Sequence, residues 1–378
     1  MELSSNARFG ERRRRHGFFF VRGLHVDVPL LVALLVLSVI GLVVLYSASG
    51  QDIEVVERQV FRLALGFSAM LVLAQVPPHQ VERWAPWLFG GGLLLLTAVL
   101  AIGVIGKGAQ RWLDLGLIRF QPSEMMKIAV PLAVSWYLAE HNLPPSAKPL
   151  IGAALMTFVP TILIAKQPDL GTALLVAASG TFVLLLSGVQ WRLVFGLIIA
   201  VIPAGVIMWQ FGMHDYQRNR VLTFIDPHKD PLGTGYHIIQ AEIAIGSGGF
   251  YGKGWLNGTQ SHLDFIPERS TDFIFAVFSE EFGLIGAILL LTIYFFIIAR
   301  GLYIASQAQS TFTRLLAGSL ILTFLVYVCV NIGMVTGLLP VVGIPLPLIS
   351  YGGTSLITVM SAFGILMSIH THRKLLPR

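Results

Sequence analysis

The chain has 378 residues, a net charge of +6 and a single cysteine. Hydrophobic residues make up 55% of it and charged residues only 12%, about half the charged share that is typical of a soluble domain. This composition excludes a soluble globular protein, and the lone cysteine excludes an internal disulfide framework. The basic cluster Arg8 and Arg12 to Arg15 indicates the cytoplasmic side of a membrane rather than a nucleic-acid site.

Long apolar stretches follow one another through the chain, and about 20 apolar residues suffice to cross a bilayer. The fold class that we expect is an all-α polytopic membrane protein, 1–378, forming a single membrane domain. No cleavable signal peptide is expected, because the first stretch is long enough to span and no small-residue cleavage site follows it closely. The sequence predicts about ten transmembrane helices, near residues 28–48, 60–76, 87–106, 123–139, 149–165, 170–188, 191–211, 273–299, 315–337 and 352–370.

The distribution of Lys and Arg in the short loops predicts the orientation of the chain. With the N-terminus inside, fourteen of these residues lie on the inner side and seven on the outer side. Both termini, including a basic tail over residues 1–27, are therefore expected in the cytoplasm. The large glycine-rich loop 212–271, between helices 7 and 8, is expected on the outer face, with the apolar segment 237–245 lying at the interface or re-entering the membrane.

Asp272 stands at the start of the eighth predicted span, after Ser270 and Thr271. Ionisable groups at the mouth of a membrane helix are costly to place and need a reason. One hypothesis is a helix cap, and the other is a general base at the outer membrane surface. Glu280 and Glu281 follow about two turns later, and we expect them to be structural, paired with a basic residue inside the bundle.

Two further helix starts carry charged residues. Pro122, Ser123 and Glu124 open the fourth span, and Lys127 shares a face with Glu124, which predicts a partly buried ion pair. The stretch Lys166-Gln167-Pro168-Asp169 precedes the sixth span and by itself indicates a helix cap. Taken with Asp272, these starts place three acids near four bases, which would suit a divalent ion and a pyrophosphate; the bases are Arg111, Lys127, Lys166 and Arg220.

The stretch Gly343 to Ser355 contains two prolines and then Gly352-Gly353. Such broken backbone survives at membrane depth only where protein buries it or where it lines a cavity, so it indicates a site that includes Ser350. Other patterns carry little weight: Gly246-Ser247-Gly248 is not a dinucleotide fingerprint. The histidines His214, His228, His237 and His262 lack metal-ligand spacing.

Together these stretches resemble the SEDS family (shape, elongation, division and sporulation) along essentially the whole chain. The resemblance rests on residues 47–52, 107–124, 166–172, 213–218, 230–239, 252–281, 331–353 and 370–374. The stretch Met213 to Arg218 favours the members that act in cell elongation over those of cell division. The family commonly has histidine where Ser270 stands, which argues against an essential role for that position.

The resemblance implies a peptidoglycan glycosyltransferase of the bacterial inner membrane that polymerises lipid II into glycan strands. It implies that Asp272 is the essential residue and that Glu124 and Lys127 are functionally sensitive. It further implies a divalent cation, Mg²⁺ or Mn²⁺, and a class B penicillin-binding protein as partner within the elongation machinery. The substrate-binding residues that we predict are Arg111, Glu124, Lys127, Lys166, Gln167, Asp169, Arg220, Glu268 and Ser350.

Two rival hypotheses belong to other classes of protein. A transporter that flips the lipid precursor would fit ten spans and broken helices. Against it, the charged groups cluster on one face and no inverted repeat is evident. A scaffold that only holds a partner helix would tolerate the loss of Asp272.

Overall fold

A computed structural model describes residues 24–106, 109–114, 119–189, 234–262, 265–266 and 268–373, with a few single positions between 196 and 222. Arg220, nearly all of the predicted seventh span and the first part of the predicted outer loop lie outside the described residues. The basic tail, residues 1–23, lies outside them as well.

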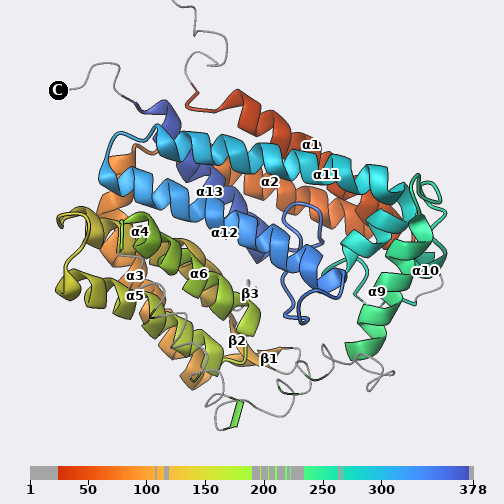
Figure 1. Cartoon of the computed structure of the whole chain (residues 1–378), viewed down its shortest axis with the longest axis horizontal. Coiled ribbons are helices and arrows are strands. Elements are labelled where there is room, and N and C mark those ends of the chain that lie inside the picture. Colours follow the sequence, from red (N-terminus) through yellow and green to blue (C-terminus); the bar gives the residue numbers. More distant parts are fainter. Residues whose placement is uncertain are drawn as a thin grey trace, which may run out of the picture.

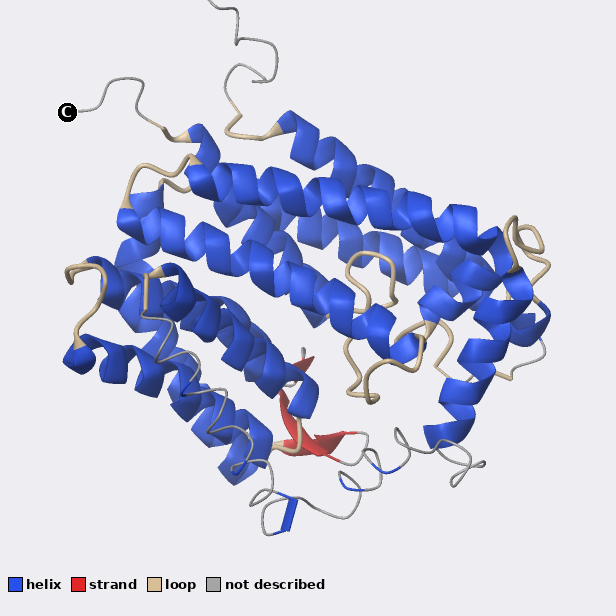
Figure 2. Ribbon diagram, in the orientation of Figure 1, coloured by secondary structure: helices blue, strands red, loops and turns tan. Residues whose placement is uncertain are grey.

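The described part of the chain is a bundle of long helices with one small sheet (Figures 1 and 2). Six of its helices are long and apolar enough to cross a membrane, namely α1, α3, α5, α11, α12 and α13. The chain is therefore a multi-pass membrane protein, as its composition predicted. The helices are α1 (Val28–Ala48), α2 (Ile53–Gln75), α3 (Pro78–Ile102), α4 (Pro122–Ala139), α5 (Ala147–Lys166), α6 (Leu170–Leu186), α9 (Thr234–Gly248), α10 (Thr259–His262), α11 (Ile274–Ser306), α12 (Thr311–Val335) and α13 (Thr354–Thr371).

The helix ends differ from the ends of the predicted spans at several places, and two of these differences have a clear cause. The second span was expected from residue 60, but α2 begins at Ile53, because Glu54 and Arg58 are exposed charges that interrupt the hydropathy without interrupting the helix. The third was expected to run to residue 106, but α3 ends at Ile102, where the chain enters a strand that the sequence analysis missed. The strands β1 (Val104–Gly106), β2 (Ala109–Asp114) and β3 (Arg119–Phe120) form an antiparallel sheet in the order β1-β2-β3.

The helix α9 lies with α10 and the start of α11 at one end of the bundle (Figure 1). It has 15 residues, which corresponds to about 22 Å, whereas the hydrocarbon core of a bilayer is about 30 Å thick. By length α9 does not span the membrane, as the sequence analysis expected for this segment.

The helix α11 is interrupted at Gly283, whose φ of 63° lies in the left-handed region. The segment 249–254 lies against this break and replaces helical hydrogen bonds: the N–H groups of Lys253 and Gly254 donate to the carbonyls of Glu280 (3.0 Å) and Glu281 (2.9 Å). Leu284 N–H in turn donates to the carbonyl of Gly249 (2.9 Å). A Cβ at Gly283 would lie 2.3 Å from the Gly252 nitrogen, so only glycine fits. The break therefore locks the segment after α9 to the first part of α11.

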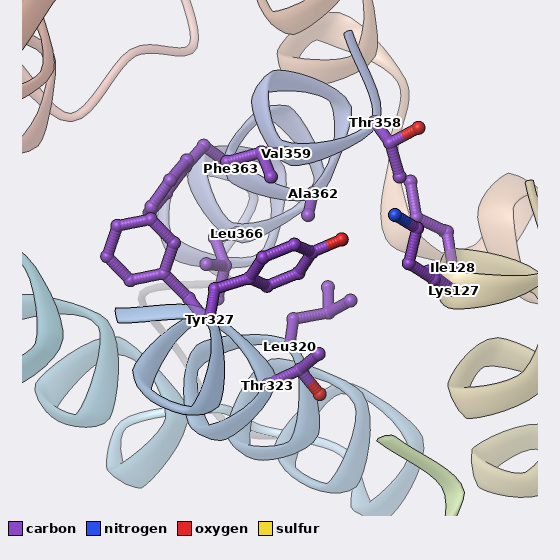
Figure 3. A pocket seen from close by; sticks show the side chains of 11 residues that line it. Lys127, Ile128, Leu320, Thr323, Tyr327, Thr358, Val359, Ala362, Phe363 and Leu366 are labelled. Atoms are coloured by element: carbon purple, nitrogen blue, oxygen red, sulfur yellow. The ribbon is translucent and has the colours of Figure 1, made fainter. Parts of the chain in front are cut away.

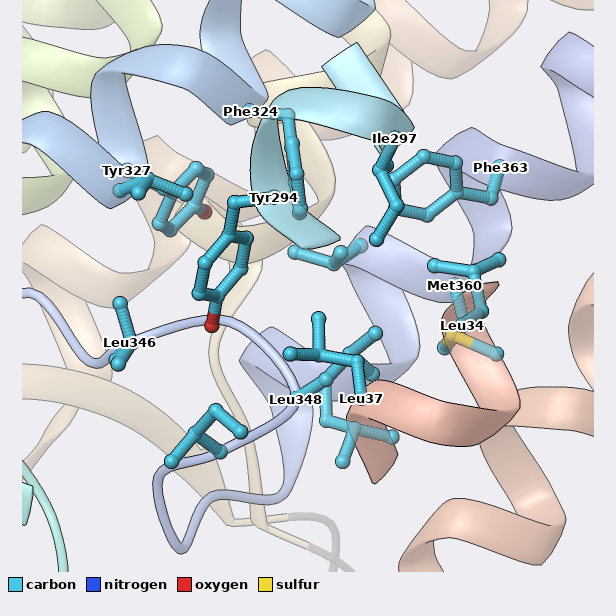
Figure 4. Close-up of a cluster of buried hydrophobic side chains, with 14 of the residues drawn as sticks. Leu34, Leu37, Tyr294, Ile297, Phe324, Tyr327, Leu346, Leu348, Met360 and Phe363 are labelled. Atoms are coloured by element: carbon cyan, nitrogen blue, oxygen red, sulfur yellow. The ribbon is translucent and has the colours of Figure 1, made fainter. Parts of the chain in front are cut away.

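The main hydrophobic core lies between α1, α11, α12 and α13, and the non-helical segment 336–353 is part of it (Figure 4). Leu346 and Leu348 from this segment are almost fully buried near Tyr294 and Leu37. The hydroxyl of the buried Tyr294 donates to the carbonyl of Pro347 at 2.7 Å. The broken segment is thus fixed within protein, which is the condition for irregular backbone at membrane depth.

Candidate active site

Asp272 lies on a short segment that two other parts of the chain hold in place. Asn331 of α12 donates from its amide to the backbone carbonyls of Asp272 (2.9 Å) and Ile344 (2.8 Å). Ser350 donates from its hydroxyl to the carbonyl of Thr271 (2.6 Å), and Tyr351 N–H donates to the carbonyl of Ser270 (2.8 Å). The backbone around Asp272 is therefore fixed by α12 and by the segment that leads into α13.

The capping hypothesis for Asp272 has little support in the geometry. The helix α11 begins at Ile274 with Phe273 as its N-cap, and the Phe273 side chain makes no capping hydrogen bond. The loop before it turns at Glu268, whose φ is 50°, and Thr271 donates from its hydroxyl to the Glu268 carboxylate at 2.8 Å. Asp272 therefore precedes the cap position rather than occupying it.

The Asp272 side chain lines a cavity of about 450 Å³. The walls come from β2, the start of α6, the first turn of α9, the loop before α11 and the broken segment before α13. A cavity of this size suits part of a ligand of small-molecule dimensions. Its lining residues are Arg111, Pro168, Asp169, Leu170, His237, Glu268, Thr271, Asp272, Phe273, Val341, Val342, Gly343, Pro345 and Tyr351.

Arg111 and Asp169 reach this cavity through a network at the starts of α4 and α6. Asp169 is the N-cap of α6: it accepts from Thr172 N–H (3.3 Å), so the predicted cap is confirmed. It also accepts from the side-chain amide of Gln121 at 2.9 Å and lies 3.9 Å from Arg111. The Arg111 guanidinium further donates to the carbonyls of Gln167 and Pro168. One arginine is thus held at the cavity wall by backbone oxygens and one carboxylate.

Glu124 and Lys127 form the predicted ion pair, with 2.6 Å between Lys127 Nζ and Glu124 Oε1. Both side chains are buried, and neither lines the cavity of Asp272. Lys127 instead borders a space of about 30 Å³, where its ammonium lies 5.2 Å from the centre of the Tyr327 ring (Figure 3). Glu124 borders a largely apolar groove of about 380 Å³ between α2, α3, α4 and α13. The structure therefore does not place this pair in one site with Asp272.

Three other predicted residues lie near the cavity without lining it. Lys166 is exposed at the end of α5, and the side chain of the buried Gln167 donates to the carbonyl of Leu96 at 3.0 Å. Ser350 is buried and uses its hydroxyl within the protein, where it also accepts from Leu346 N–H at 2.8 Å. Of the predicted set, the structure brings together Arg111, Asp169, Glu268 and Asp272.

Glu280 and Glu281 have structural partners, as expected. Lys253 Nζ lies 2.7 Å from Glu280 Oε1, and Thr259 also donates to this oxygen at 3.1 Å, which confirms the predicted pairing with a basic residue. Ser47 of α1 donates from its hydroxyl to Glu281. These carboxylates hold the segment 253–259 and α1 against α11.

Two polar aromatic side chains of the cavity, His237 and Tyr351, were not among the predicted site residues. The spacing of His237 fits no metal site, although its place in the half-length apolar segment 237–245 could have drawn attention to it. Tyr351 lies under Arg62 of α2, with 4.3 Å from the guanidinium carbon to the ring centre. Nothing in the local sequence connects α2 with this segment.

No group of three or more His, Cys, Asp or Glu side chains in the described ranges lies close enough together to hold a metal ion. The described residues therefore offer no complete set of protein ligands for the divalent cation that the family resemblance implies. A magnesium ion commonly needs only one or two carboxylates when substrate phosphates supply its other ligands.

The sequence matches the FtsW/RodA/SpoVE family of cell cycle proteins over residues 28–375. It is 57% identical to the peptidoglycan glycosyltransferase MrdB of Escherichia coli K12, across 94% of this chain and 96% of that protein. A solved structure of a peptidoglycan synthase complex that coordinates polymerization and crosslinking contains a similar chain, with a TM-score of 0.79 and 31% identity over 91% of this chain and 97% of that one. The rod shape determining protein RodA of Thermus thermophilus gives a TM-score of 0.71 at 28% identity, covering 93% and 100% of the two chains.

Proposed function

The chain belongs to the FtsW/RodA/SpoVE family, and we propose that this peptidoglycan glycosyltransferase polymerises lipid II at the Asp272 cavity, with Asp272 as general base. The observation that carries the proposal is the shared cavity: Asp272 and Glu268 reach it from the loop before α11, and Arg111 reaches it from β2. A base and a cation at one concave site are the two groups that transfer of a sugar from a diphosphate requires.

The reaction that we propose is a single inverting displacement. The donor sugar is α-linked to a diphosphate and the product bond is β-1,4, so the acceptor hydroxyl attacks the anomeric carbon from the opposite face. The bond from that carbon to the diphosphate oxygen breaks, its electron pair leaves with the diphosphate, and Asp272 takes the hydroxyl proton. The fixed backbone around Asp272 supports this role, because a general base must lie within hydrogen-bond reach of the proton it removes.

Arg111 is the side chain to which we assign charge compensation on the leaving diphosphate. Its guanidinium is always protonated and matches phosphate geometry. Asp169 and the carbonyls of Gln167 and Pro168 keep it oriented before substrate arrives. A divalent cation, Mg²⁺ or Mn²⁺, remains part of the proposal; it would bind mainly to the oxygens of the diphosphate and would supply further charge compensation beside Arg111.

Contacts between substrate and Glu124, Lys127, Lys166, Gln167, Arg220 and Ser350 remain predictions. So does the topology of ten spans, with both termini in the cytoplasm and the loop 212–271 on the outer face. We also propose that a class B penicillin-binding protein is the partner, as the similarity to a subunit of a peptidoglycan synthase complex supports. Products of a polymerase at the outer face would then reach a transpeptidase directly.

Purified protein given lipid II in detergent tests the proposed base. We expect glycan strands from the wild-type protein and a loss of at least about 100-fold for Asp272→Asn, the scale that general-base catalysis contributes. Asp52→Asn is the matched control, because Asp52 is an exposed carboxylate that caps α2 and does not line the cavity. Normal polymer from Asp272→Asn would overturn the assignment, and lipid movement across vesicles without polymer would favour a transporter.

A further inference from the structure

His237 is a cavity residue to which the proposed mechanism gives no part. It lies in the first turn of α9 and lines the same cavity as Asp272. Its ring stacks on Phe273, the residue next to Asp272, with 5.8 Å between the ring centres and 26° between the planes. Phe273 is itself only 3% exposed, so this stack rests on a fixed support.

The remainder of α9 explains why His237 is held at the cavity wall. Ile238, Ala241 and Ala244 are almost fully buried, at 2%, 0% and 0% exposure, and Ala241 and Ala244 belong to the main core. His237 is only partly buried. The segment that follows α9 is locked into the break of α11, as described above. The helix therefore presents His237 to the cavity from a rigid element.

The stack covers one face of the imidazole, so the ring can form hydrogen bonds only in its plane; Nδ1 is buried, and Nε2 is therefore the nitrogen that a bound sugar could reach. Its two nitrogens lie at the ring edge, whereas Phe273 covers a face. A neutral imidazole offers one donor and one acceptor. The His237 ring is a suitable contact for a sugar, because a sugar presents hydroxyls around its edge and C–H groups on its faces.

The charges in the cavity indicate which part of the substrate lies here. Two carboxylates, Glu268 and Asp272, come from the loop that contains Phe273. Among the described residues lining the cavity, Arg111 is the one lysine or arginine, and it is held by the start of α6 rather than by α9 or α11. A diphosphate would be repelled by the carboxylates and attracted to Arg111. An uncharged sugar hydroxyl suits the carboxylate side.

We propose that His237 binds the acceptor sugar, with its imidazole edge hydrogen-bonded to a hydroxyl next to the one that Asp272 deprotonates. This inference rests on the proposed function, because it takes Asp272 as the base. His237 then orients the sugar relative to the carboxylate, and the proton still passes from the acceptor hydroxyl to Asp272.

Two substitutions separate this role from simple packing. His237→Gln keeps a donor and an acceptor at similar reach but loses the aromatic stack, whereas His237→Phe keeps the stack and loses both hydrogen-bonding atoms. We expect His237→Phe to lower the polymerisation rate at subsaturating lipid II about tenfold, the scale of one lost hydrogen bond. His237→Gln should stay within about threefold of wild type. The opposite order would show that packing on Phe273 is the role of His237 and would overturn the proposal.

A third substitution tests a phosphate contact instead. His237→Lys keeps a donor and adds a positive charge but cannot accept a hydrogen bond. We expect His237→Lys to lower the polymerisation rate as much as His237→Phe does. Activity restored by lysine but not by glutamine would assign His237 to the diphosphate and overturn the sugar contact.

Binding of lipid II to catalytically inactive protein separates this inference from the assignment of the base. In an Asp272→Asn background, His237→Phe should weaken binding of fluorescent lipid II about tenfold, while His237→Gln should leave it nearly unchanged. Unchanged binding and rate in His237→Phe would overturn the role of His237 and leave that of Asp272 standing. Full polymerisation by Asp272→Asn would instead remove the base on which the inference rests. Thermal unfolding of each variant, compared with wild type, identifies any that fail to fold.

Discussion

Asp27 and Asp272 each precede a long membrane helix, yet their surroundings differ completely. Asp27 is the N-cap of α1: its carboxylate accepts from Leu30 N–H (3.0 Å) and forms an ion pair with Arg300 of α11 (2.7 Å). His370 of α13 lies 2.8 Å from the same carboxylate. Asp27 is 2% exposed, whereas Asp272 lines a cavity of about 450 Å³.

Arg300 and His370 enclose the carboxylate of Asp27 and stabilise its ionised form. Burial raises the pKa of Asp27, but hydrogen bonds from His370, Arg300 and Leu30 outweigh it and hold that pKa well below its ordinary value. The carboxylate therefore stays charged and joins the ends of three helices, α1, α11 and α13. The comparison teaches that an acid before a membrane helix is structural when protein groups enclose it, and available for chemistry when a cavity does.

The largest stability effect that we expect comes from Asp27→Asn. It leaves Arg300 and His370 without the charge that they share, and breaking a largely buried ion pair costs about 3 kcal/mol. Thermal unfolding in detergent should show this loss, while the polymerisation rate per folded molecule stays close to wild type. Asp272→Asn should give the reverse pattern. If Asp27→Asn abolished polymerisation in fully folded protein, the contrast between the two aspartates would fail.

The support of Asp272 is tested by Asn331→Asp. This change removes both amide hydrogen bonds, to the carbonyls of Asp272 and Ile344, and places a carboxylate beside them. We expect a loss of about 2 kcal/mol in stability and about tenfold in polymerisation rate. Asn257→Asp, at an exposed loop position, is the matched control and should change neither. An active, stable Asn331→Asp protein would mean that the site does not depend on this clamp.

A smaller effect is expected for Ser350→Ala. The buried hydroxyl donates to the carbonyl of Thr271 and accepts from Leu346 N–H, so its removal should cost about 1 to 2 kcal/mol. Ser68→Ala is the control, because the Ser68 hydroxyl is exposed and bonds only within its own helix turn. Chemical unfolding of the two variants measures the difference. Equal stability of both would show that the Ser350 contacts contribute little.

The smallest effect concerns pH at the end of the bundle where α13 ends and α1 begins. His372 stacks on His25 at 3.9 Å, and burial, together with the charges of His25 and His79, lowers its pKa. Because the folded state favours the neutral ring, this group contributes stability above its unfolded pKa of about 6.5 that is lost as the pH falls below it. His372→Gln should therefore show a smaller fall in unfolding temperature between pH 7.5 and 5.5 than wild type. An identical fall in both proteins would exclude this contribution.

Features that depend on local sequence were predictable. Apolar blocks predicted most of the helices, Pro122 predicted the start of α4, and Asp169 predicted the cap of α6. Helices and their caps depend on neighbours within one or two turns, so a local pattern indicates them. The ion pair between Glu124 and Lys127 joins residues three apart on one helix and was found as expected. The short strands β1 to β3 were missed, since two to six residues carry too little periodicity to indicate a strand.

What the sequence by itself determined is a polytopic helical membrane protein with Asp272 as the candidate base, and the family resemblance singled out that residue. Only the tertiary structure decided which acids are enclosed by protein groups and which line the cavity. In the folded chain Asn331 donates to the carbonyl of Asp272, 59 residues away, and Ser350 donates to the carbonyl of Thr271, 79 residues away. The tertiary structure also separated Glu124 and Lys127 from that cavity and brought His237 into it. Burial and hydrogen bonding depend on groups brought from distant parts of the chain, and no local pattern records them.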